Sequence, residues 1–211
     1  MSLPEIELGD IIVVERRQDV RIIANIAGRF MLSNRRDARG ERRVFACRAV
    51  NLSSRAIALA SPITAKLGDR VIAHIDHLGK LEGCVIRELE RGFVMGISAS
   101  PEEQDRLIDK IVWLDKHKNH EVPDKRGDGR MVPANPYSRM MLADGHQETC
   151  LVLDVSVSGA AISANTVPEM GTVVAIGSIV GRVVRHFEGG FAVQFLERQN
   201  PHVVEASVIR H

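Results

Sequence analysis

The sequence predicts a mainly β protein that contains two tandem copies of one small domain, with a helix after the first copy. Three observations support this prediction: a repeat that relates the two halves of the chain, short Val- and Ile-rich segments between turn residues, and one capped amphipathic segment. The chain has 211 residues, 45% of them hydrophobic and 26% charged, which is typical of a soluble globular protein. This length accommodates one ordinary domain or two small ones.

The repeat consists of two aligned blocks. In the first block, ACRAVNLSSRAIAL from Ala46 aligns with TCLVLDVSVSGAAI from Thr149, at an offset of 103 residues. In the second block, GCVIRELERGFVMGI from Gly83 aligns with GRVVRHFEGGFAVQF from Gly181, at an offset of 98. The loss of five residues between the blocks predicts a shorter hairpin loop in the second copy. We expect the two copies to cover residues 14–118 and 123–211.

Each copy contains short segments that resemble β-strands. They are rich in Val, Ile and Phe, partly alternate between apolar and polar residues, and are separated by Gly, Ser and Pro. This pattern is typical of a small barrel or sandwich. In the first copy the predicted strands are 20–32, 44–51, 70–76, 82–89 and 92–98. In the second copy they are 137–143, 149–155, 160–164, 172–176, 179–186 and 190–196.

One segment, 101–118, has the features of an amphipathic helix. Ser100 is a good N-cap, Pro101 suits the first helical position, and Glu103 completes a capping box. The apolar residues that follow recur at helical spacing and would bury one face. The next segment, 119–130, is polar and contains Pro and Gly, so we expect a linker there. A weaker helix is expected near the C-terminus, after an Asn-Pro pair.

Composition excludes several classes of protein. No apolar run is long enough to span a membrane, and the acidic N-terminus lacks the basic region of a secretory signal. The cysteines Cys47, Cys84 and Cys150 are far apart and form no CxxC pair, so we expect neither a disulfide framework nor a thiolate zinc site. We therefore expect a cytoplasmic protein without a membrane partner. The net charge of +1 gives no overall attraction to nucleic acid.

The sequence carries no recognisable catalytic or metal-binding motif. It lacks a P-loop, a GxSxG elbow, an HExxH helix and a GxGxxG loop. The pairs His74/His77 and His117/His120 have no further ligands near them in the sequence, so no metal site is expected. We predict that the protein is not an enzyme and uses no cofactor.

In each copy, a pair of arginines at positions i and i+4 precedes the first strand. The pairs are Arg17 with Arg21 and Arg126 with Arg130. An arginine in such a polar segment can fold over a ligand and offer a planar fork to phosphate oxygens or to guanine O6 and N7. The same spacing occurs elsewhere in this arginine-rich chain, so only the position distinguishes these two pairs. The alternative interpretation is a solvated charged turn.

A second pattern ends a strand in each copy. It consists of Asn51, Ser53 and Ala56 in the first copy and of Asp154, Ser156 and Gly159 in the second. A carboxylate such as that of Asp154 can accept the N1–H and N2–H donors of a guanine, and a serine hydroxyl can donate or accept. A glycine permits positive φ or close backbone approach. The alternative is ordinary turn chemistry, in which Asp and Ser bond their own backbone.

Taken together, these patterns resemble a known family. RRQDVR followed by NLSSRA, and KRGDGR followed by DVSVSG, resemble the RxxxR and (D/N)xSxxG signatures of PilZ domains. The resemblance occurs twice, in the same order, and covers almost the whole chain. It implies two tandem six-stranded antiparallel barrels, the first followed by an amphipathic helix. It also implies that the chain is a receptor for cyclic di-GMP.

The resemblance further implies roles for individual residues. In the second copy, Arg126 and Arg130 would clamp phosphates and guanine Hoogsteen edges, while Asp154 and Ser156 would hold a guanine and Gly159 would make room. In the first copy the corresponding residues are Arg17, Arg21, Asn51 and Ser53. The basic residues that precede the two RxxxR motifs, associated in this family with a stacked ligand dimer, are Arg16 and Lys125.

The first copy departs from the family pattern at Ala56, where the family has glycine. If the backbone there needed positive φ, alanine would cost about 1 kcal/mol, and its methyl group would crowd a ligand. Ligand binding by the first copy is therefore less certain than by the second.

Three hypotheses for function follow. The first is a bacterial cyclic di-GMP receptor whose barrels reorient on binding and which controls, through a downstream protein partner, an output such as motility or exopolysaccharide production. The second is a PilZ-type protein-docking module or homodimer surface in which one or both ligand sites are lost. The third, an RNA- or DNA-binding barrel, is weakened by the small number of aromatic residues available for base stacking: six Phe, one Tyr and one Trp.

Overall fold

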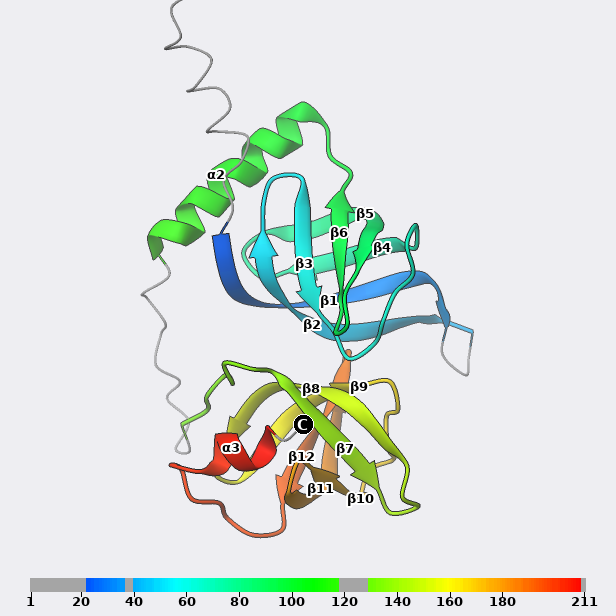
Figure 1. Ribbon diagram of the computed structural model, residues 1–211, viewed down its shortest axis with the longest axis vertical. Coiled ribbons are helices and arrows are strands. Elements are labelled where there is room, and N and C mark those ends of the chain that lie inside the picture. Colours follow the sequence, from blue (N-terminus) through cyan, green and yellow to red (C-terminus); the bar gives the residue numbers. More distant parts are fainter. Residues whose placement is uncertain (1–21, 37–39, 118–128, 210–211) are drawn as a thin grey trace, which may run out of the picture.

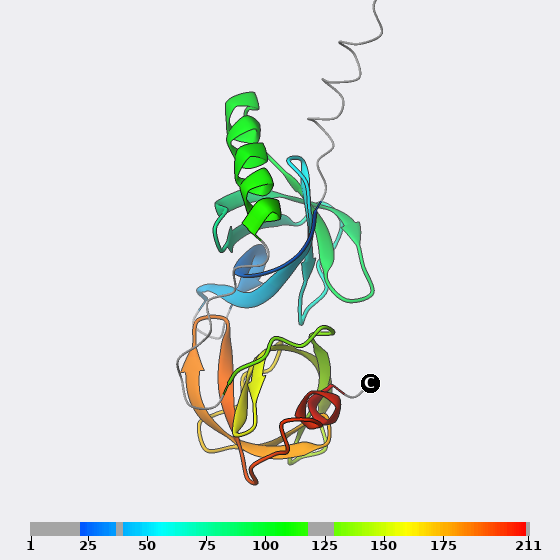
Figure 2. The same cartoon turned by 90° about the vertical axis from the view of Figure 1, so that its left-hand side faces the viewer.

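The computed structural model of this chain describes residues 22–36, 40–117 and 129–209. Within these ranges the chain forms two closed six-stranded antiparallel barrels, which lie one above the other in Figures 1 and 2. Barrel 1 consists of β1 (Ile22–Arg36), β2 (Arg42–Leu52), β3 (Ala56–Ala60), β4 (Arg70–Ile75), β5 (Gly79–Glu88) and β6 (Phe93–Ile97). Barrel 2 consists of β7 (Tyr137–Leu142), β8 (Gln147–Ser156), β9 (Gly159–Ala164), β10 (Val173–Ile176), β11 (Ile179–Phe187) and β12 (Gly190–Phe195).

The two barrels have the same topology. The strand order is β1-β2-β3-β6-β5-β4 in barrel 1, and the equivalent β7-β8-β9-β12-β11-β10 in barrel 2. Each barrel closes because its first strand pairs with its fourth. The predicted fold class, two tandem six-stranded antiparallel barrels with a helix after the first, is therefore confirmed. It is the architecture that the resemblance to PilZ domains implies.

The sequence pattern did not predict β3, whose residues are AIALA. This strand is only five residues long, and alanine at alternate positions gives little contrast between its two faces. The repeat supplies the missing signal, because the same offset that aligns Asn51 with Asp154 places this segment on β9.

The predicted shortening of one hairpin is confirmed. In barrel 1, β4 and β5 pair as far as Ile75 and Gly79, whereas in barrel 2, β10 and β11 pair as far as Ile176 and Ile179. Because β10 is two residues shorter than β4 and its turn is tighter, the second copy needs fewer residues to close the same barrel.

The core of barrel 1 is built around three phenylalanines. Phe30 stacks on Phe45 with ring centroids 5.6 Å apart, and meets Phe93 edge-on at 5.1 Å. All three side chains are fully buried, and each such burial stabilises the barrel by about 2 to 3 kcal/mol. In barrel 2, Phe191 occupies the position that the repeat aligns with Phe93.

Helix α2 (Pro101–His117) closes barrel 1 at one end. Its capping box forms as predicted: the Ser100 amide donates to the Glu103 carboxylate at 2.8 Å, and the Glu103 amide donates to the Ser100 hydroxyl oxygen at 3.3 Å. The hydrogen bonds from Ser100 lower the pKa of the Glu103 carboxyl. Leu107 and Ile111 are buried in the barrel core, whereas Trp113 is 52% exposed. The predicted C-terminal helix is α3 (Val204–Val208).

The barrels meet where β2 faces β8 and β9. Tyr137, buried at this junction, accepts a hydrogen bond from the Ser61 amide at 3.2 Å and donates one to the Arg91 carbonyl at 2.6 Å. It packs with Ala60 and Leu151 in a small apolar cluster. The turn between β11 and β12 adds a backbone contact, from the Ala46 amide to the carbonyl of Gly189.

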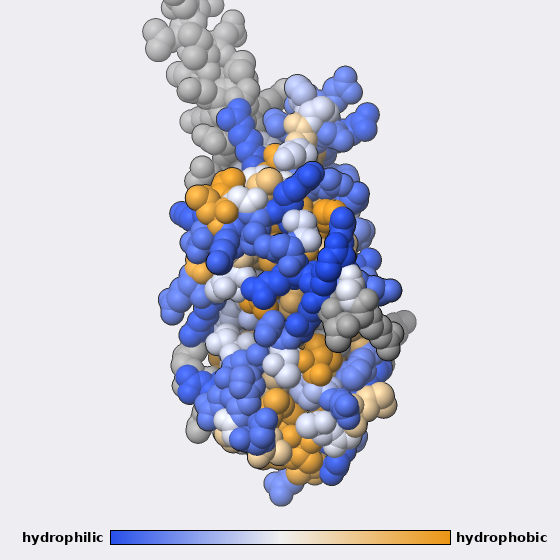
Figure 3. All heavy atoms as spheres, turned by 90° about the vertical axis from the view of Figure 1, so that its right-hand side faces the viewer, coloured by the Kyte–Doolittle hydropathy of each residue, from blue (hydrophilic) through white to orange (hydrophobic). Residues whose placement is uncertain are grey.

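All three cysteines are free. Burial raises the pKa of Cys47 and raises that of Cys150 to about 12, so both thiols stay protonated near neutral pH. None of the helices in the described ranges combines the length and apolar character needed to cross a membrane. On the face shown in Figure 3, hydrophilic side chains cover most of barrel 1, and the apolar side chains between them form small groups.

Candidate functional site

Each barrel has a β-bulge directly before its (D/N)xSxxG motif. The pairing register shifts between Val152 and Asp154 on β8, and between Ala49 and Asn51 on β2. A bulge interrupts the alternation of a strand and redirects the side chains that follow it. Asp154 in barrel 2 and Asn51 in barrel 1 therefore occupy equivalent positions near the end of a strand, where the bulge changes the direction of the side chain.

Arg130 forms an ion pair with Asp154. Its Nη1 atom lies 3.1 Å from Oδ1 and 3.3 Å from Oδ2 of the carboxylate. Backbone hydrogen bonds between Met131 and Val155, one in each direction at 2.9 Å, hold the two segments side by side. The last arginine of KRGDGR is thus brought against the acidic residue of DVSVSG by main-chain pairing and by charge.

A cavity of about 220 Å³ opens beside this ion pair. Its polar edge is formed by Arg130, Asp154 and Ser156. Its apolar wall includes Ala161 and Val184. This volume is below that of an ordinary small-molecule pocket, so it suits one part of a ligand, such as a single base.

Val184 was not identified from the sequence. It lies at a second bulge, where the pairing of β11 with β12 shifts between Val183 and Arg185. Its side chain faces outward, as the alternation from Val180 and Arg182 along β11 predicts, and it is 40% exposed beside the candidate site. Barrel 1 has the equivalent bulge, and Ile86 is 53% exposed there. The repeat aligns Ile86 with Val184, and this match of two aliphatic residues was the signal available in the sequence.

The two motif serines hold hairpin turns. The Ser156 hydroxyl lies 3.3 Å from the Gly159 carbonyl, to which it donates, and accepts from the Ser158 amide at 3.3 Å. In barrel 1, the Ser53 hydroxyl oxygen accepts from the Ala56 amide at 3.1 Å. The turn chemistry considered as the alternative interpretation is therefore present at both serines.

Gly159 is required for close backbone approach rather than for positive φ. Its φ is not in the left-handed region, but a Cβ added there would lie 2.4 Å from the carbonyl oxygen of Val193 on β12. In barrel 1, Ala56 is also free of positive φ and pairs with Gly96. The φ penalty considered for Ala56 therefore does not arise. The small residue of this cross-strand pair is Gly96, on the other strand.

Barrel 1 has a cavity in the equivalent position. It has a volume of about 360 Å³, and Asn51, Ser53 and Ala56 line it together with Ile86. Arg87 also lines this cavity, whereas its repeat partner in barrel 2 does not line the cavity there. The two sites are thus built on one plan, but barrel 1 has the uncharged Asn51 where barrel 2 has Asp154.

The structure brings together four of the predicted residues of the second copy: Arg130, Asp154, Ser156 and Gly159. It brings together Asn51 and Ser53 in the first. The other predicted site residues lie outside the described residues: Arg16, Arg17, Arg21, Lys125 and Arg126.

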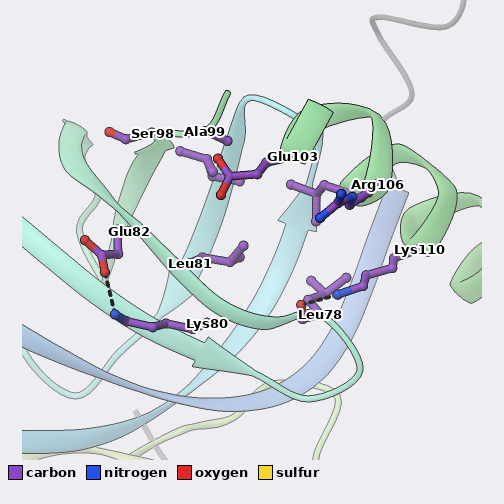
Figure 4. A pocket seen from close by; sticks show the side chains of 11 residues that line it. Leu78, Lys80, Leu81, Glu82, Ser98, Ala99, Glu103, Arg106 and Lys110 are labelled. Carbon is purple, nitrogen blue, oxygen red and sulfur yellow. Dashed lines mark hydrogen bonds and ion pairs between the residues drawn. The ribbon is translucent and has the colours of Figure 1, made fainter. Parts of the chain in front are cut away.

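A larger cavity, of about 570 Å³, lies between β5 and helix α2 (Figure 4). Several of its charged side chains already have partners: Lys80 pairs with Glu82, and Lys110 donates to the Leu78 carbonyl at 2.9 Å. None of the motif residues lines it, so size alone does not identify the candidate site. Among the described residues, no group of three or more His, Cys, Asp or Glu side chains could hold a metal ion.

No family model and no curated protein matches the chain. Among solved structures, it is similar to Borreliella burgdorferi PlzA in complex with c-di-GMP, with 11% identity over 92% of this chain and 94% of that chain and a TM-score of 0.27. It is also similar to the Bacillus subtilis inhibitor of motility MotI/DgrA, with 10% identity over 89% and 94% of the two chains and a TM-score of 0.28. These low values carry no argument about function.

Proposed function

We propose that this chain is a tandem PilZ-type receptor for cyclic di-GMP, with its main ligand site on barrel 2. One observation carries the proposal: Arg130 of the RxxxR motif lies against Asp154 of the DxSxxG motif, at the edge of a cavity that Ser156 and Gly159 also line. Two motifs that are separate in the sequence form one site in the fold.

The side chains of this site suit the two parts of the ligand. The Asp154 carboxylate accepts the N1–H and N2–H donors of a guanine, and the exposed aliphatic surface of Val184 offers the base a flat contact. Arg130 keeps the carboxylate neutralised until the ligand arrives and then pairs with a phosphate. Because both side chains of the ion pair are partly exposed, at 38% and 29%, exchanging partners costs little.

The cavity beside Asp154 is too small for a ligand with two guanines and two phosphates. The segment that carries Lys125 and Arg126 supplies the remaining contacts by folding over the ligand. Several arginine–phosphate contacts make the affinity fall as the salt concentration rises. Because this segment connects the two barrels in the chain, ligand binding also fixes their relative arrangement.

Barrel 1 provides a second, weaker site, to which Arg16, Arg17 and Arg21 contribute. The amide oxygen of Asn51 accepts one guanine donor but lacks the charge of a carboxylate, so this site discriminates less strongly in favour of guanine. The proposed output is control of bacterial motility or exopolysaccharide production through a downstream protein partner, by a protein that is not an enzyme.

A protein-docking module is the second candidate function. It is favoured by Asn51, which gives barrel 1 an amide in place of the carboxylate of barrel 2, and by the exposed indole of Trp113 on α2, an aromatic side chain of the kind that anchors protein interfaces. In that case the chain binds a protein, or a second copy of itself, without cyclic di-GMP.

Isothermal titration of cyclic di-GMP into the full chain tests the proposal. We expect wild-type protein to bind, Arg126→Ala to abolish binding at barrel 2, and Arg17→Ala to affect only the weaker site. Small-angle scattering with and without ligand tests the change in arrangement. Absence of binding to wild-type protein would reject the receptor and leave the docking module, whereas binding without a change in scattering would reject only the rearrangement.

A further inference from the structure

Arg48, on β2 of barrel 1, is buried at the junction between the barrels. Its exposed fraction is only 6%, and fully buried arginines are rare unless they are paired. The side chain crosses the junction, where Nη2 donates a hydrogen bond to the carbonyl of Leu153 on β8. Its Nε atom is buried and has no hydrogen-bond partner among the described residues.

The carbonyl that Arg48 holds belongs to the peptide unit of Asp154. A peptide unit is planar, so a hydrogen bond to the Leu153 oxygen fixes the orientation of the Asp154 amide as well. This unit lies at the β8 bulge, where regular strand pairing is interrupted. Arg48 therefore acts on the backbone of Asp154 at the point where the sheet constrains it least.

The guanidinium of Arg48 also lies within electrostatic range of the Asp154 carboxylate. Burial lowers the pKa of Arg48, and the charge of Asp154 opposes this shift. Two arginines therefore act on Asp154: Arg130 pairs with its carboxylate, and Arg48 from the other barrel bonds the carbonyl of its peptide unit.

We propose that Arg48 is a positioning residue for the Asp154 site, so that barrel 1 completes the binding site of barrel 2 across the junction. Arg48 does this without contact with the ligand, through the Leu153–Asp154 peptide unit. The effect on ligand affinity rests on the proposed function, whereas the effect on the Asp154 backbone does not.

Arg43 provides a matched control. It lies on the same strand and also crosses the junction, where its Nη2 atom donates to the Ala164 carbonyl at 3.2 Å and to that of Asn165. These carbonyls lie at the far end of β9, away from Asp154. Replacing either arginine removes a hydrogen bond across the junction, but only Arg48 acts on the candidate site.

The first test uses the amide signal of Asp154 in ¹H–¹⁵N correlation spectra of the full chain without ligand. We expect Arg48→Met to shift this signal more than Arg43→Met does, and Arg48→Lys to restore part of the shift. Unchanged signals from barrel 1 core amides, such as those of Phe93 and Met95, establish that the variants fold. If Arg48→Met does not fold, Arg48→Lys and wild-type protein still provide the comparison. If the Asp154 amide signal has the same position in wild type and in both Arg48 variants, the proposal is overturned.

The second test is titration of cyclic di-GMP into the same proteins. We expect Arg48→Met to weaken binding about tenfold, because it removes a hydrogen bond donated by a charged group. We expect Arg43→Met to change the affinity less than about twofold. Equal weakening by both variants would assign the effect to the junction as a whole and overturn the proposal. If Arg48→Met shifts the Asp154 amide but wild-type protein does not bind cyclic di-GMP, the proposed function is rejected and the positioning role stands.

Discussion

The carbonyl oxygen of Gly189 accepts a hydrogen bond from the amide of Ala46 at 3.1 Å and so joins the backbones of the two barrels. Gly189 has a φ of +89°, and a Cβ added there would lie 2.6 Å from the Ala46 nitrogen. Only glycine therefore satisfies both requirements of this position, the left-handed backbone and the close approach of another chain segment.

Gly189→Ala is expected to destabilise the protein by more than the cost of its φ alone. The left-handed conformation costs an alanine about 1 to 2 kcal/mol, and the clash with Ala46 adds to this by separating the barrels. Urea unfolding measures the difference. The matched control is Gly171→Ala, because Gly171 has a φ of +85° but no atom within 4 Å of an added Cβ. Equal losses in the two variants would show that the junction contact contributes nothing.

Gly159→Ala is expected to destabilise barrel 2 by about 1 to 3 kcal/mol without any ligand present, because the added methyl group lies too close to the β12 backbone. Thermal unfolding of the ligand-free chain measures this loss. The converse change, Ala56→Gly, is expected to cost about 0.5 to 1 kcal/mol through chain entropy and to leave the barrel 1 site unchanged. A Gly159→Ala variant as stable as wild type would mean that the glycine serves ligand entry alone.

Asp154→Asn is expected to separate binding from stability. Because Asp154 and Arg130 are partly exposed, losing their ion pair costs at most about 1 kcal/mol of unfolding free energy. Affinity for cyclic di-GMP should fall at least about tenfold, since an amide cannot accept both guanine donors as a carboxylate does. Titration calorimetry and urea unfolding on the same preparation check both effects. Unchanged affinity would contradict the assigned role of Asp154.

Tyr137→Phe is expected to weaken the junction between the barrels. The hydroxyl group accepts from the Ser61 amide and donates to the Arg91 carbonyl, and removing it leaves both groups without this partner. A loss of about 1 to 3 kcal/mol is expected in urea unfolding. Tyr137→Leu, which also removes the ring contact with Arg91, should cost more. A fully stable Tyr137→Phe variant would show that other groups replace the hydroxyl.

Stability should fall at alkaline pH because of the buried thiols. Burial raises the pKa of Cys150 from 9.0 to about 12, so the unfolded chain loses this proton at lower pH than the folded chain. The stabilising effect is complete below pH 9.0 and is lost as the pH rises through about 12. Within that window each such thiol contributes a slope of about 1.4 kcal/mol per pH unit. Urea unfolding at several pH values should show a shallower slope for Cys150→Ala than for wild type, and identical slopes would contradict the assignment.

Much of the site was predictable because its parts are local. The capping box of α2 needs only Ser100 and Glu103, three residues apart, and the order of the two motifs is visible in the chain. The resemblance assigned Arg130 and Asp154 to one ligand site, but it did not predict their contact with each other. Val184 and Ile86 were missed because alternation places them on the outward face of a strand but does not show that this face borders a candidate site.

Arg48 illustrates what a sequence pattern does not contain. On β2 it is one arginine among many in an alternating strand, and nothing nearby in the sequence distinguishes it from an exposed residue such as Arg42. Its burial follows from the docking of β8 of barrel 2 against this strand, which brings Leu153 to it from 105 residues away. Alternation identifies the inward and outward faces of a strand. It does not show which strands have an outward face that a second domain covers.

The sequence by itself predicted two copies of one β-rich domain, the capped helix after the first and the motif residues of each copy, because alternation, capping and short motifs are local patterns. The six-stranded barrels were implied by the resemblance to PilZ domains, and their strand order came from the tertiary structure. Only the tertiary structure decided that Gly159 serves backbone approach, that Arg130 meets Asp154, and that Arg48 bonds the Leu153 carbonyl across the junction. These depend on distances between segments far apart in the chain, and those distances are set when two closed barrels pack their surfaces together.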